Sequence, residues 1–301
     1  MKFRHLLFSL YRKLNFGKLT SRRLMLLPSF LLFQVGLYSQ SIGTFNIQTP
    51  SKGNSILEIA VRVPGGYSRQ AAGKFGVLVL FGGRNWEGRR TIETYRFNEF
   101  ADRYGMFIVS PSFKDDEYWQ PEKWSGKALL DTLDKIYEKY GLDRKKKIFC
   151  YGYSAGAQCV NLFLAWKPEI VEAWSLHACG VWLDPDNSRS LKAPGLATCG
   201  ELDIGRRELS ISRIAKMREN GCTVIWKSFP GEGHGLPGAA LKLAEAFFES
   251  CISNPERKIK FVGDDQLMRY FPIESKEVKF IDEGGRNEFY DEKLAGMWGG
   301  K

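Results

Sequence analysis

A serine, an aspartate and a histidine are the residues of this 301-residue chain whose types and surroundings best suit catalysis. The serine lies in the segment G-Y-S-A-G, residues 152–156, between an apolar strand-like run and an apolar helix-like run. A strand, a tight turn and a helix in this order hold a serine in a strained elbow that exposes its hydroxyl. Flanking glycines let the strand and the helix approach closely. The pattern predicts Ser154 as the nucleophile of an acyl transfer.

A serine hydroxyl is a poor nucleophile until a base takes its proton, and histidine is a common base. Beyond residues 1–39 the chain has two histidines, His177 and His234. His234 lies in a glycine-rich loop at residues 231–235, where a side chain can reach out of the scaffold. We therefore expect His234 to be the base. His177 ends an apolar strand, and we expect it to be a structural residue or a substrate contact.

The third member should be a carboxylate that holds the imidazole in one tautomer and stabilises its cation. The strand expected at residues 195–199 leads directly into Glu201 and Asp203. Asp203 lies in the loop after this strand and is the expected acid, with Glu201, two residues away, as the alternative. The three groups then follow the chain order serine, acid, histidine, each at the carboxyl end of a strand.

Two backbone N–H groups are needed to stabilise the negative oxygen that forms when a serine attacks a carbonyl. The N–H of Ala155, directly after the serine, is one expected donor. The second should follow the apolar strand at residues 75–81, which leaves the choice open between Gly83 and Arg84. Residues 83–90 also approach a phosphate-loop pattern, but arginines stand where that pattern needs Lys and Ser or Thr. Nucleotide binding is therefore not expected.

Aromatic side chains in loops at the same sheet edge are candidates for substrate contacts. Trp86 follows the expected oxyanion loop, Tyr153 precedes the serine, and Trp119 and Trp124 follow the strand expected at residues 107–110. Flat apolar rings suit a phenolic acyl group or a sugar ring. The alternative is that two or three of them only pack against a C-terminal segment.

Strands alternate with helices from about residue 45 to residue 252, which is typical of a mostly parallel sheet covered on both faces. Further strands are expected at residues 56–63, 147–151 and 223–229, and another strand should end near His177. Helices are expected at residues 91–104, 126–140 and 206–220. Two more helices should follow the serine and the histidine loop. The first clear break is Ser253-Asn254-Pro255. We expect a catalytic domain at residues 40–255 and a C-terminal extension at 256–301 that wraps it, with a flexible tail as the alternative.

The elbow and the order Ser154, Asp203, His234 resemble the α/β-hydrolase superfamily over residues 45–252. The Gly-x-x-Asp and Gly-His-Gly loops, without an obvious inserted lid, look most like secreted polyhydroxybutyrate depolymerases and feruloyl esterases. Dienelactone-hydrolase-like and prolyl-oligopeptidase-like domains share much of this pattern. Phe81 departs from it, because such hydrolases commonly carry His-Gly at this point.

This resemblance implies a serine hydrolase that cleaves carboxylic esters, small or polymeric, without a cofactor or a metal. A serine peptidase of the same fold is one alternative. The other is a non-catalytic carbohydrate-binding protein that keeps the fold, which the phenylalanine at position 81 would favour and an intact Ser, Asp and His set would not.

The formal net charge of +10 with neutral histidines raises the question of nucleic-acid binding. Residues 1–39 hold seven basic and no acidic side chains, so the rest of the chain carries only +3. A largely apolar run at 24–37, interrupted by Pro28, ends at a small residue, as in a secretory signal. It is short for a permanent membrane span, and the paired arginines at 22–23 resemble a twin-arginine leader. We expect residues 1–39 to be a signal peptide and the protein to be secreted or periplasmic, without nucleic-acid binding.

Export would place the six cysteines in an oxidising compartment, where an even number is compatible with disulfides. No two of them form a CxxC pair, so a metal cluster is not expected. Cys150 and Cys199 each end an apolar run and are expected to be small buried hydrophobic residues. Pairing among the others stays open.

Overall fold

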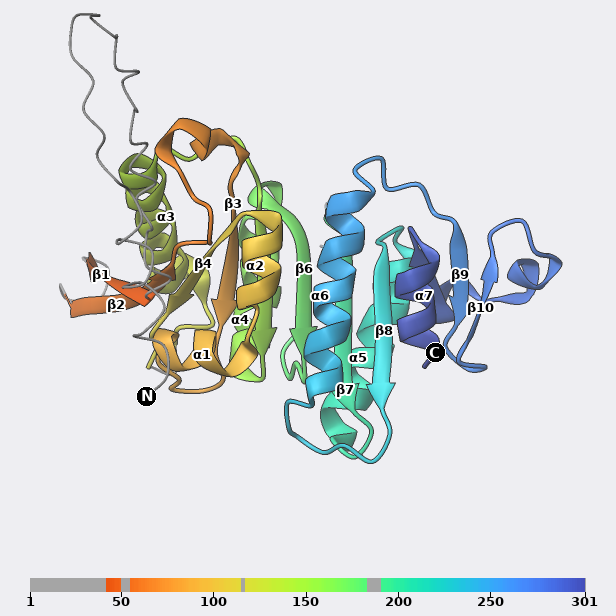
Figure 1. Ribbon diagram of the computed structural model, residues 1–301. Coiled ribbons are helices and arrows are strands. Elements are labelled where there is room, and N and C mark those ends of the chain that lie inside the picture. Colours follow the sequence, from red (N-terminus) through yellow and green to blue (C-terminus); the bar gives the residue numbers. More distant parts are fainter. Residues whose placement is uncertain (1–41, 50–54, 115–116, 183–190, 301) are drawn as a thin grey trace, which may run out of the picture. The chain divides into compact units, whose positions relative to one another are not determined.

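The computed structural model describes residues 42–49, 55–114, 117–182 and 191–300, and the signal peptide expected at 1–39 lies outside them. The strands of the main sheet are β1 (Ile42–Thr49), β2 (Ser55–Arg62), β3 (Gly76–Phe81), β4 (Met106–Pro111), β5 (Ile148–Tyr153), β6 (Val171–His177), β7 (Gly195–Gly200) and β8 (Val224–Phe229). Their order in the sheet is β1-β2-β4-β3-β5-β6-β7-β8 (Figure 1). Among the helices of the described residues, none is long and apolar enough to span a membrane.

The sheet is parallel from β4 to β8 and antiparallel at its first edge. β3 pairs in parallel with β4 and β5, and β6, β7 and β8 continue the parallel pairing. β2 runs antiparallel to both β1 and β4. The sequence predicted β2 but no strand at β1. Carboxyl ends of parallel strands lie at one edge of the sheet, so loops after β3, β5, β7 and β8 gather there.

Helices cover both faces of the sheet, as the sequence predicts. Their bounds are α1 (Gly88–Tyr95), α2 (Asn98–Tyr104), α3 (Gly126–Tyr140), α4 (Ala155–Trp166), α5 (Ile204–Glu219), α6 (Gly238–Ser253) and α7 (Glu292–Gly299), with short helical turns η2 (Arg69–Lys74), η3 (Pro121–Ser125), η4 (Pro168–Ile170), η6 (Lys276–Phe280) and η7 (Glu283–Gly285). Val77 and Val79 of β3 join one core cluster with α3, α4 and α5. Leu78 and Leu80, between them, join the cluster on the other face with α1, α2, α6 and α7. This alternation explains why β3 is apolar throughout.

The single helix predicted at residues 91–104 is instead two helices, α1 and α2. Arg96 ends α1 in the left-handed conformation, with φ 57°, and its N–H donates to the Ile92 carbonyl. Phe97, directly after it, is fully buried and packs its ring 5.3 Å from that of Tyr151 on β5. Burying this ring against the sheet turns the chain, which outweighs the local helical periodicity of the sequence.

The C-terminal extension forms a small antiparallel sheet and a helix. Its strands are β9 (Phe261–Asp264), β10 (Arg269–Pro272) and β11 (Arg286–Phe289), in the order β10-β9-β11, and α7 follows them (Figure 1). Trp298 of α7 is fully buried in the same core cluster as α6, and its indole N–H donates to the Trp226 carbonyl of β8 at 2.6 Å. The described residues of the extension therefore share a hydrophobic core with the main sheet and α6. A flexible tail would not be part of such a core.

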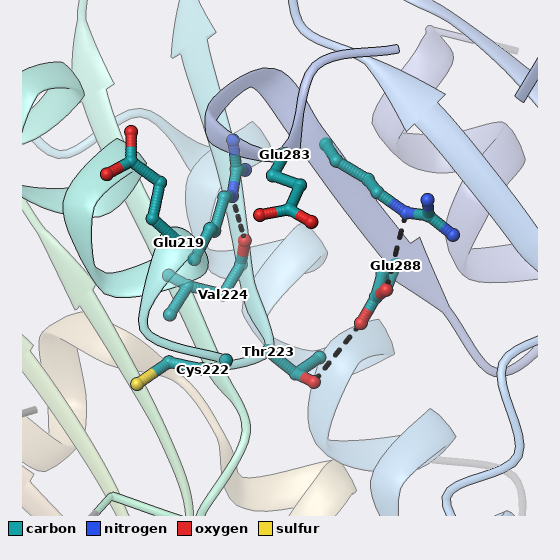
Figure 2. Close-up of a pocket in the computed structure, with 9 residues that line it drawn as sticks. Glu219, Cys222, Thr223, Val224, Glu283 and Glu288 are labelled. Carbon is teal, nitrogen blue, oxygen red and sulfur yellow. Dashed lines mark hydrogen bonds and ion pairs between the residues drawn. The ribbon is translucent and has the colours of Figure 1, made fainter. Parts of the chain in front are cut away.

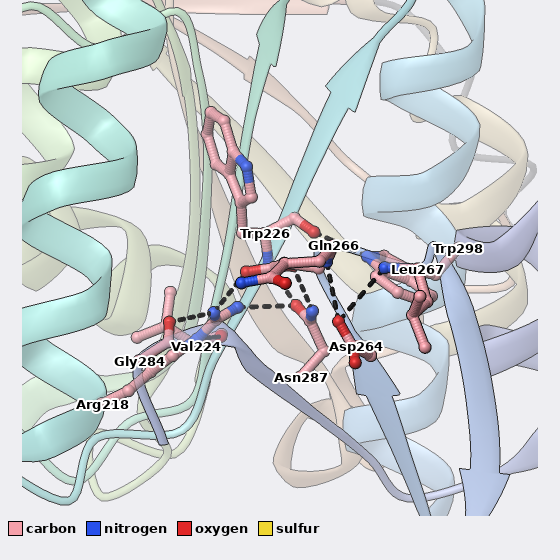
Figure 3. A network of polar contacts seen from close by, with 10 residues as sticks. Arg218, Val224, Trp226, Asp264, Gln266, Leu267, Gly284, Asn287 and Trp298 are labelled. Carbon is pink, nitrogen blue, oxygen red and sulfur yellow. Dashed lines mark hydrogen bonds and ion pairs between the residues drawn. The ribbon is translucent and has the colours of Figure 1, made fainter. Parts of the chain in front are cut away.

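A buried polar network joins the extension to α5 and β8 (Figure 3). Arg218 of α5 donates to Asp265 at 2.6 Å and to the Asn287 side-chain oxygen at 2.7 Å. That same oxygen accepts the backbone N–H of Trp226 at 2.6 Å. Burial lowers the pKa of Arg218, and the adjacent carboxylate of Asp265 opposes this effect. A buried guanidinium with these partners ties three elements together.

All six cysteines lie within the described residues, and each is a buried thiol that is not joined in a disulfide. The disulfides that export would allow are thus not formed. Burial raises the pKa of the thiols, to about 12 at Cys179, Cys199 and Cys251. Buried thiols of this kind pack as small apolar groups, as the sequence predicts for Cys150 and Cys199.

Candidate active site

Ser154 occupies a sharp turn between β5 and α4. Its backbone has φ 55° and ψ −117°, a region that costs a non-glycine residue about 1–3 kcal/mol. The Ser154 N–H donates to the His177 carbonyl at 2.9 Å, which fixes the turn to β6. A Cβ on Gly152 would collide with the Gly156 carbonyl, and one on Gly156 would collide with the Phe81 carbonyl at the end of β3. Both glycines are therefore required by close backbone packing.

Three side chains that the sequence singled out lie in contact at the carboxyl edge of the sheet. Ser154 Oγ is 3.0 Å from His234 Nε2, and His234 Nδ1 is 2.6 Å from Asp203 Oδ2. Both distances are within hydrogen-bonding range. Asp203 is buried at the start of α5, whereas the imidazole is 36% exposed and open to solvent. The arrangement can pass a proton from the hydroxyl to a ring held by a carboxylate.

Glu201, the alternative acid, has a different partner. Its Oε2 accepts the backbone N–H of Gly231 at 3.0 Å. Nearby, the Leu202 N–H donates to the Glu232 carbonyl at 2.8 Å. These bonds hold the loop that carries His234 against the end of β7. Glu201 thus supports the loop, and Asp203 is the carboxylate at the imidazole.

His177 is fully buried at the end of β6. Its Nδ1 lies 2.8 Å from the Thr198 hydroxyl of β7. Burial lowers the pKa of His177 to about 4, so the ring is neutral at pH 7. Of the two roles expected for His177, the structural one fits this position, because a fully buried ring does not face an open cleft.

Tyr153 lies between the two histidines. Its ring stacks on His234 at 5.5 Å and on His177 at 6.0 Å, with interplanar angles of 28° and 29°. Its hydroxyl donates to the His234 backbone carbonyl at 3.2 Å. Burial raises the pKa of Tyr153, with Asp203 raising it further and Arg206 opposing, so the hydroxyl stays a donor. The residue expected to contact substrate therefore braces the histidine loop.

The expected oxyanion donors lie on the two sides of the elbow. Ala155 is the first residue of α4, and the first N–H groups of a helix have no intrahelical acceptor. Gly83 is buried after β3, where a Cβ would lie 3.3 Å from the Tyr153 ring. Arg84, the other candidate, is exposed. The Phe81 side chain is buried in the core beside β3, and an oxyanion donor in the following loop would be a backbone N–H, which needs no particular side chain at position 81.

The aromatic candidates separate into two environments. Trp86 is half-buried beside the elbow, with its ring 5.8 Å from that of Tyr153 and the Arg90 guanidinium 4.5 Å above it. Trp124, by contrast, is buried in the core, where its ring lies 5.4 Å from that of Phe113. Its expected place in an open cleft needs correction, because the large apolar ring is removed from water.

Trp119 is half-buried above the same core cluster. Its ring lies 5.4 Å from that of Tyr118, which is itself buried. Neither this contact nor any other described one joins Trp119 to the serine elbow, so its role as a substrate contact stays a prediction.

Arg206 is a charged neighbour of the site that the sequence analysis missed. Its Nη1 lies 3.3 Å from Asp203 Oδ1, the carboxylate oxygen that does not face His234. The available signal was the spacing of the two residues, because positions three apart are neighbours on a helix.

A cavity of about 400 Å³ lies away from this site, between α5, β8 and β11 (Figure 2). Glu219, Glu283 and Glu288 line it together with Arg218 and Arg286. Glu288 accepts a hydrogen bond from the Thr223 hydroxyl and forms an ion pair with Arg286. These charged side chains therefore already have partners within the protein. Within the described ranges, no group of three or more His, Cys, Asp or Glu side chains is placed to hold a metal ion.

No protein-family model and no curated protein sequence matches the chain. Solved structures do match. A poly(3-hydroxybutyrate) depolymerase from Bordetella parapertussis has a TM-score of 0.54 at 17% identity, over 69% of this chain and 89% of its own. A ferulic acid esterase from Anaeromyces mucronatus, in complex with ferulic acid, has a TM-score of 0.54 at 16% identity, over 69% of this chain and 89% of its own. A poly(aspartic acid) hydrolase from Sphingomonas sp. KT-1 has a TM-score of 0.53 at 12% identity, over 68% of this chain and 97% of its own.

These proteins share the mostly parallel sheet with helices on both faces and cover the greater part of this chain. Their low identities establish likeness of fold and leave activity to the site itself. On the order of its strands and its likeness to these structures, the chain has the α/β-hydrolase fold.

Proposed function

We propose that this protein is an exported serine hydrolase that cleaves carboxylic esters through an acyl-enzyme on Ser154. One observation carries the proposal: the continuous contact from Ser154 Oγ to His234 Nε2 at 3.0 Å and from His234 Nδ1 to Asp203 Oδ2 at 2.6 Å. A nucleophile, a base and an orienting acid in this geometry form the constellation that acyl transfer requires.

The first step is attack of the Ser154 oxygen on the ester carbonyl. The hydroxyl proton passes to His234 Nε2, and Asp203 stabilises the cation that forms. The N–H groups of Ala155 and Gly83 stabilise the oxyanion, with Arg84 as the alternative to Gly83. His234 then returns its proton to the leaving alcohol.

Deacylation repeats these roles with water as the nucleophile. His234 takes the proton of the water molecule as it attacks the acyl carbonyl, and Ser154 leaves with that proton. The chain supplies each group that these two steps use, so the proposal includes no cofactor.

An aromatic or similarly flat acyl group fits the environment beside the elbow. The half-buried Trp86 ring lies 5.8 Å from that of Tyr153, and aromatic rings of this kind suit stacking with a flat acyl group. The resemblance to structures called depolymerase and ferulic acid esterase supports ester substrates, small or polymeric. The basic and then apolar sequence of residues 1–39, which we expect to be a signal peptide, supports action outside the cytoplasm.

The test is turnover of a short-chain aryl ester together with labelling by a fluorophosphonate. Ser154→Ala should abolish both, whereas Ser212→Ala, which removes an exposed hydroxyl of α5, should leave both at wild-type level. Labelling or wild-type turnover by the Ser154→Ala protein would overturn the proposal. So would a wild-type protein that binds sugars in calorimetry but never forms an acyl-enzyme.

A serine peptidase is the second candidate, and the likeness to a poly(aspartic acid) hydrolase favours it, because that polymer is joined by amide bonds. In a peptidase, His234 protonates a leaving amine rather than an alcohol. Matched ester and amide substrates with one acyl group separate the two: turnover of the ester without measurable cleavage of the amide supports the esterase, and catalytic cleavage of the amide supports the peptidase.

A further inference from the structure

The carboxylate of Asp203 is shared between two cationic or potentially cationic partners. Oδ2 lies 2.6 Å from His234 Nδ1, and Oδ1 lies 3.3 Å from Arg206 Nη1. The Asp203 side chain is 8% exposed, and that of Arg206 is 38% exposed. The guanidinium therefore covers the outer oxygen of a buried acid whose inner oxygen faces the imidazole.

The Arg206 side chain passes close to Gly180, in the loop after β6. A Cβ on Gly180, after β6, would lie 3.2 Å from Arg206 Nε and 3.1 Å from Gln158 Nε2. Gln158 stands four residues after Ser154 on α4, and its N–H donates to the Ser154 carbonyl at 3.1 Å. The side chains of Arg206 and of Gln158, on the helix that begins at the nucleophile, thus both lie close to Gly180.

The charge of Arg206 acts on several groups of the site. Burial raises the pKa of Cys199, Asp203 raises it further, and Arg206 opposes both. Burial is also the main cause that raises the pKa of Tyr153. Asp203 raises this pKa further, and Arg206 lowers it. The guanidinium therefore opposes the effect of the Asp203 carboxylate at these two neighbours of the imidazole.

We propose that Arg206 is a positioning residue: by holding Oδ1 of Asp203, it aims Oδ2 at His234 and limits how strongly the carboxylate stabilises the protonated imidazole. This inference rests on the proposed function, because it assigns Arg206 a part in the same proton transfer. The consequence is that Arg206 sets the lower pH limit of turnover.

Within the described residues, the titratable and charged groups that interact with Asp203 or His234 include Cys199 of β7, Tyr153 of β5, His177 of β6 and Arg206 of α5, and the Ser154 hydroxyl lies beside His234. Of these, Arg206 is the group that carries a permanent positive charge. Removing that charge strengthens the negative potential at His234, favours the imidazolium and raises the pH needed to obtain the neutral base.

The experiment compares pH profiles of kcat/KM on a neutral aryl ester, and KM is also measured on an anionic ester of the same phenol. Arg206→Gln and Arg206→Met, which keeps an apolar stem beside Gly180, should move the acid limb upward by about half a pH unit or more. Both should lower kcat about 3- to 10-fold with KM changed less than about twofold. Arg206→Lys should restore the limb to within about 0.2 units, because it restores the charge.

Arg207→Gln is the matched control, because it removes the same charge one residue along α5. Its profile should overlay that of the wild type. Thermal unfolding of each variant separates loss of the fold from loss of positioning: a variant with a wild-type Tm and a displaced limb supports the inference.

Three results overturn the role of Arg206 while leaving the proposed function standing. They are an unmoved acid limb in both neutral variants, an equal displacement in Arg207→Gln, and a rise in KM confined to anionic esters, which would make Arg206 a substrate contact. Wild-type turnover by Ser154→Ala would instead overturn the proposed function, and this inference with it.

Discussion

The phenol ring of Tyr153 stacks on the imidazole of His234, and its hydroxyl donates to the backbone carbonyl of that same histidine. The ring centroids are 5.5 Å apart, and the hydrogen bond is 3.2 Å long. Tyr153 directly precedes Ser154 in the chain, so one side chain spans from the elbow to the loop that carries the proposed base. The loop is otherwise tied to the end of β7 by Glu201.

Tyr153→Phe should keep the stacking and lose the hydrogen bond. A neutral hydrogen bond contributes about 1 kcal/mol, so we expect kcat/KM on an aryl ester to fall about fivefold. Tyr153→Ala should lose both contacts, and its kcat/KM should fall further. Tyr270→Phe, on β10 in the extension, is the control and should not change kcat/KM; an unchanged Tyr153→Ala enzyme would refute this role for the ring.

The choice between the two acids predicts very different losses. Asp203→Asn should lower kcat by about 10⁴, because the amide favours the wrong imidazole tautomer. Glu201→Gln should cost less than about tenfold, since Glu201 bonds Gly231 rather than the imidazole. Steady-state kinetics at saturating ester measures both, and equal losses would contradict the assignment of Asp203 as the acid.

Gly156→Ala should destabilise the fold as well as the site. The added methyl group would collide with the Phe81 carbonyl, a backbone atom that cannot move aside alone. We expect the free energy of unfolding in urea to fall by about 3 kcal/mol. Gly205→Ala is the matched control, because no atom lies within 4 Å of a Cβ there, and helix propensity makes it neutral or slightly stabilising.

His177 makes stability depend on pH. Its pKa is about 4 in the folded protein because the ring is buried, against about 6.5 for an exposed histidine. Between these values the unfolded chain binds a proton that the folded protein does not. Stability therefore rises with pH in this window, and His177 contributes up to about 3 kcal/mol that is lost as the pH falls from 6.5 to 4.

Urea unfolding at pH 7, 6, 5 and 4 measures this effect. His177→Gln should flatten the dependence relative to the wild type, although it lowers stability at pH 7. Parallel curves for wild type and His177→Gln would show that His177 is not the source.

Asn287→Ala should loosen the C-terminal extension. It leaves the Trp226 N–H and one arm of the buried Arg218 without their acceptor. Losing a partner of a buried charged group costs about 3 kcal/mol, so the midpoint of urea unfolding should fall. Gln266→Ala, an exposed residue of the nearby turn, should not shift the midpoint; a wild-type midpoint for Asn287→Ala would exclude this network as an anchor.

The elbow could be predicted from local sequence alone. An apolar strand, two glycines around Ser154 and an apolar helix are consecutive in the chain, and they dictate a turn that the structure shows as φ 55° at the serine. The main strands and the helix at residues 126–140 could be predicted in the same way. Their hydrophobic periodicity is a local property that each segment carries with it.

Contacts between distant segments decided the rest. The sequence left Glu201 beside Asp203, and only the packing of the histidine loop on β7 distinguishes them. It placed Tyr153 and Trp124 together as candidate substrate contacts, and only the tertiary structure shows that Trp124 fills the core whereas Tyr153 lies against His234. Burial and cross-strand pairing depend on residues dozens of positions away, and no local pattern encodes which partner a side chain will meet.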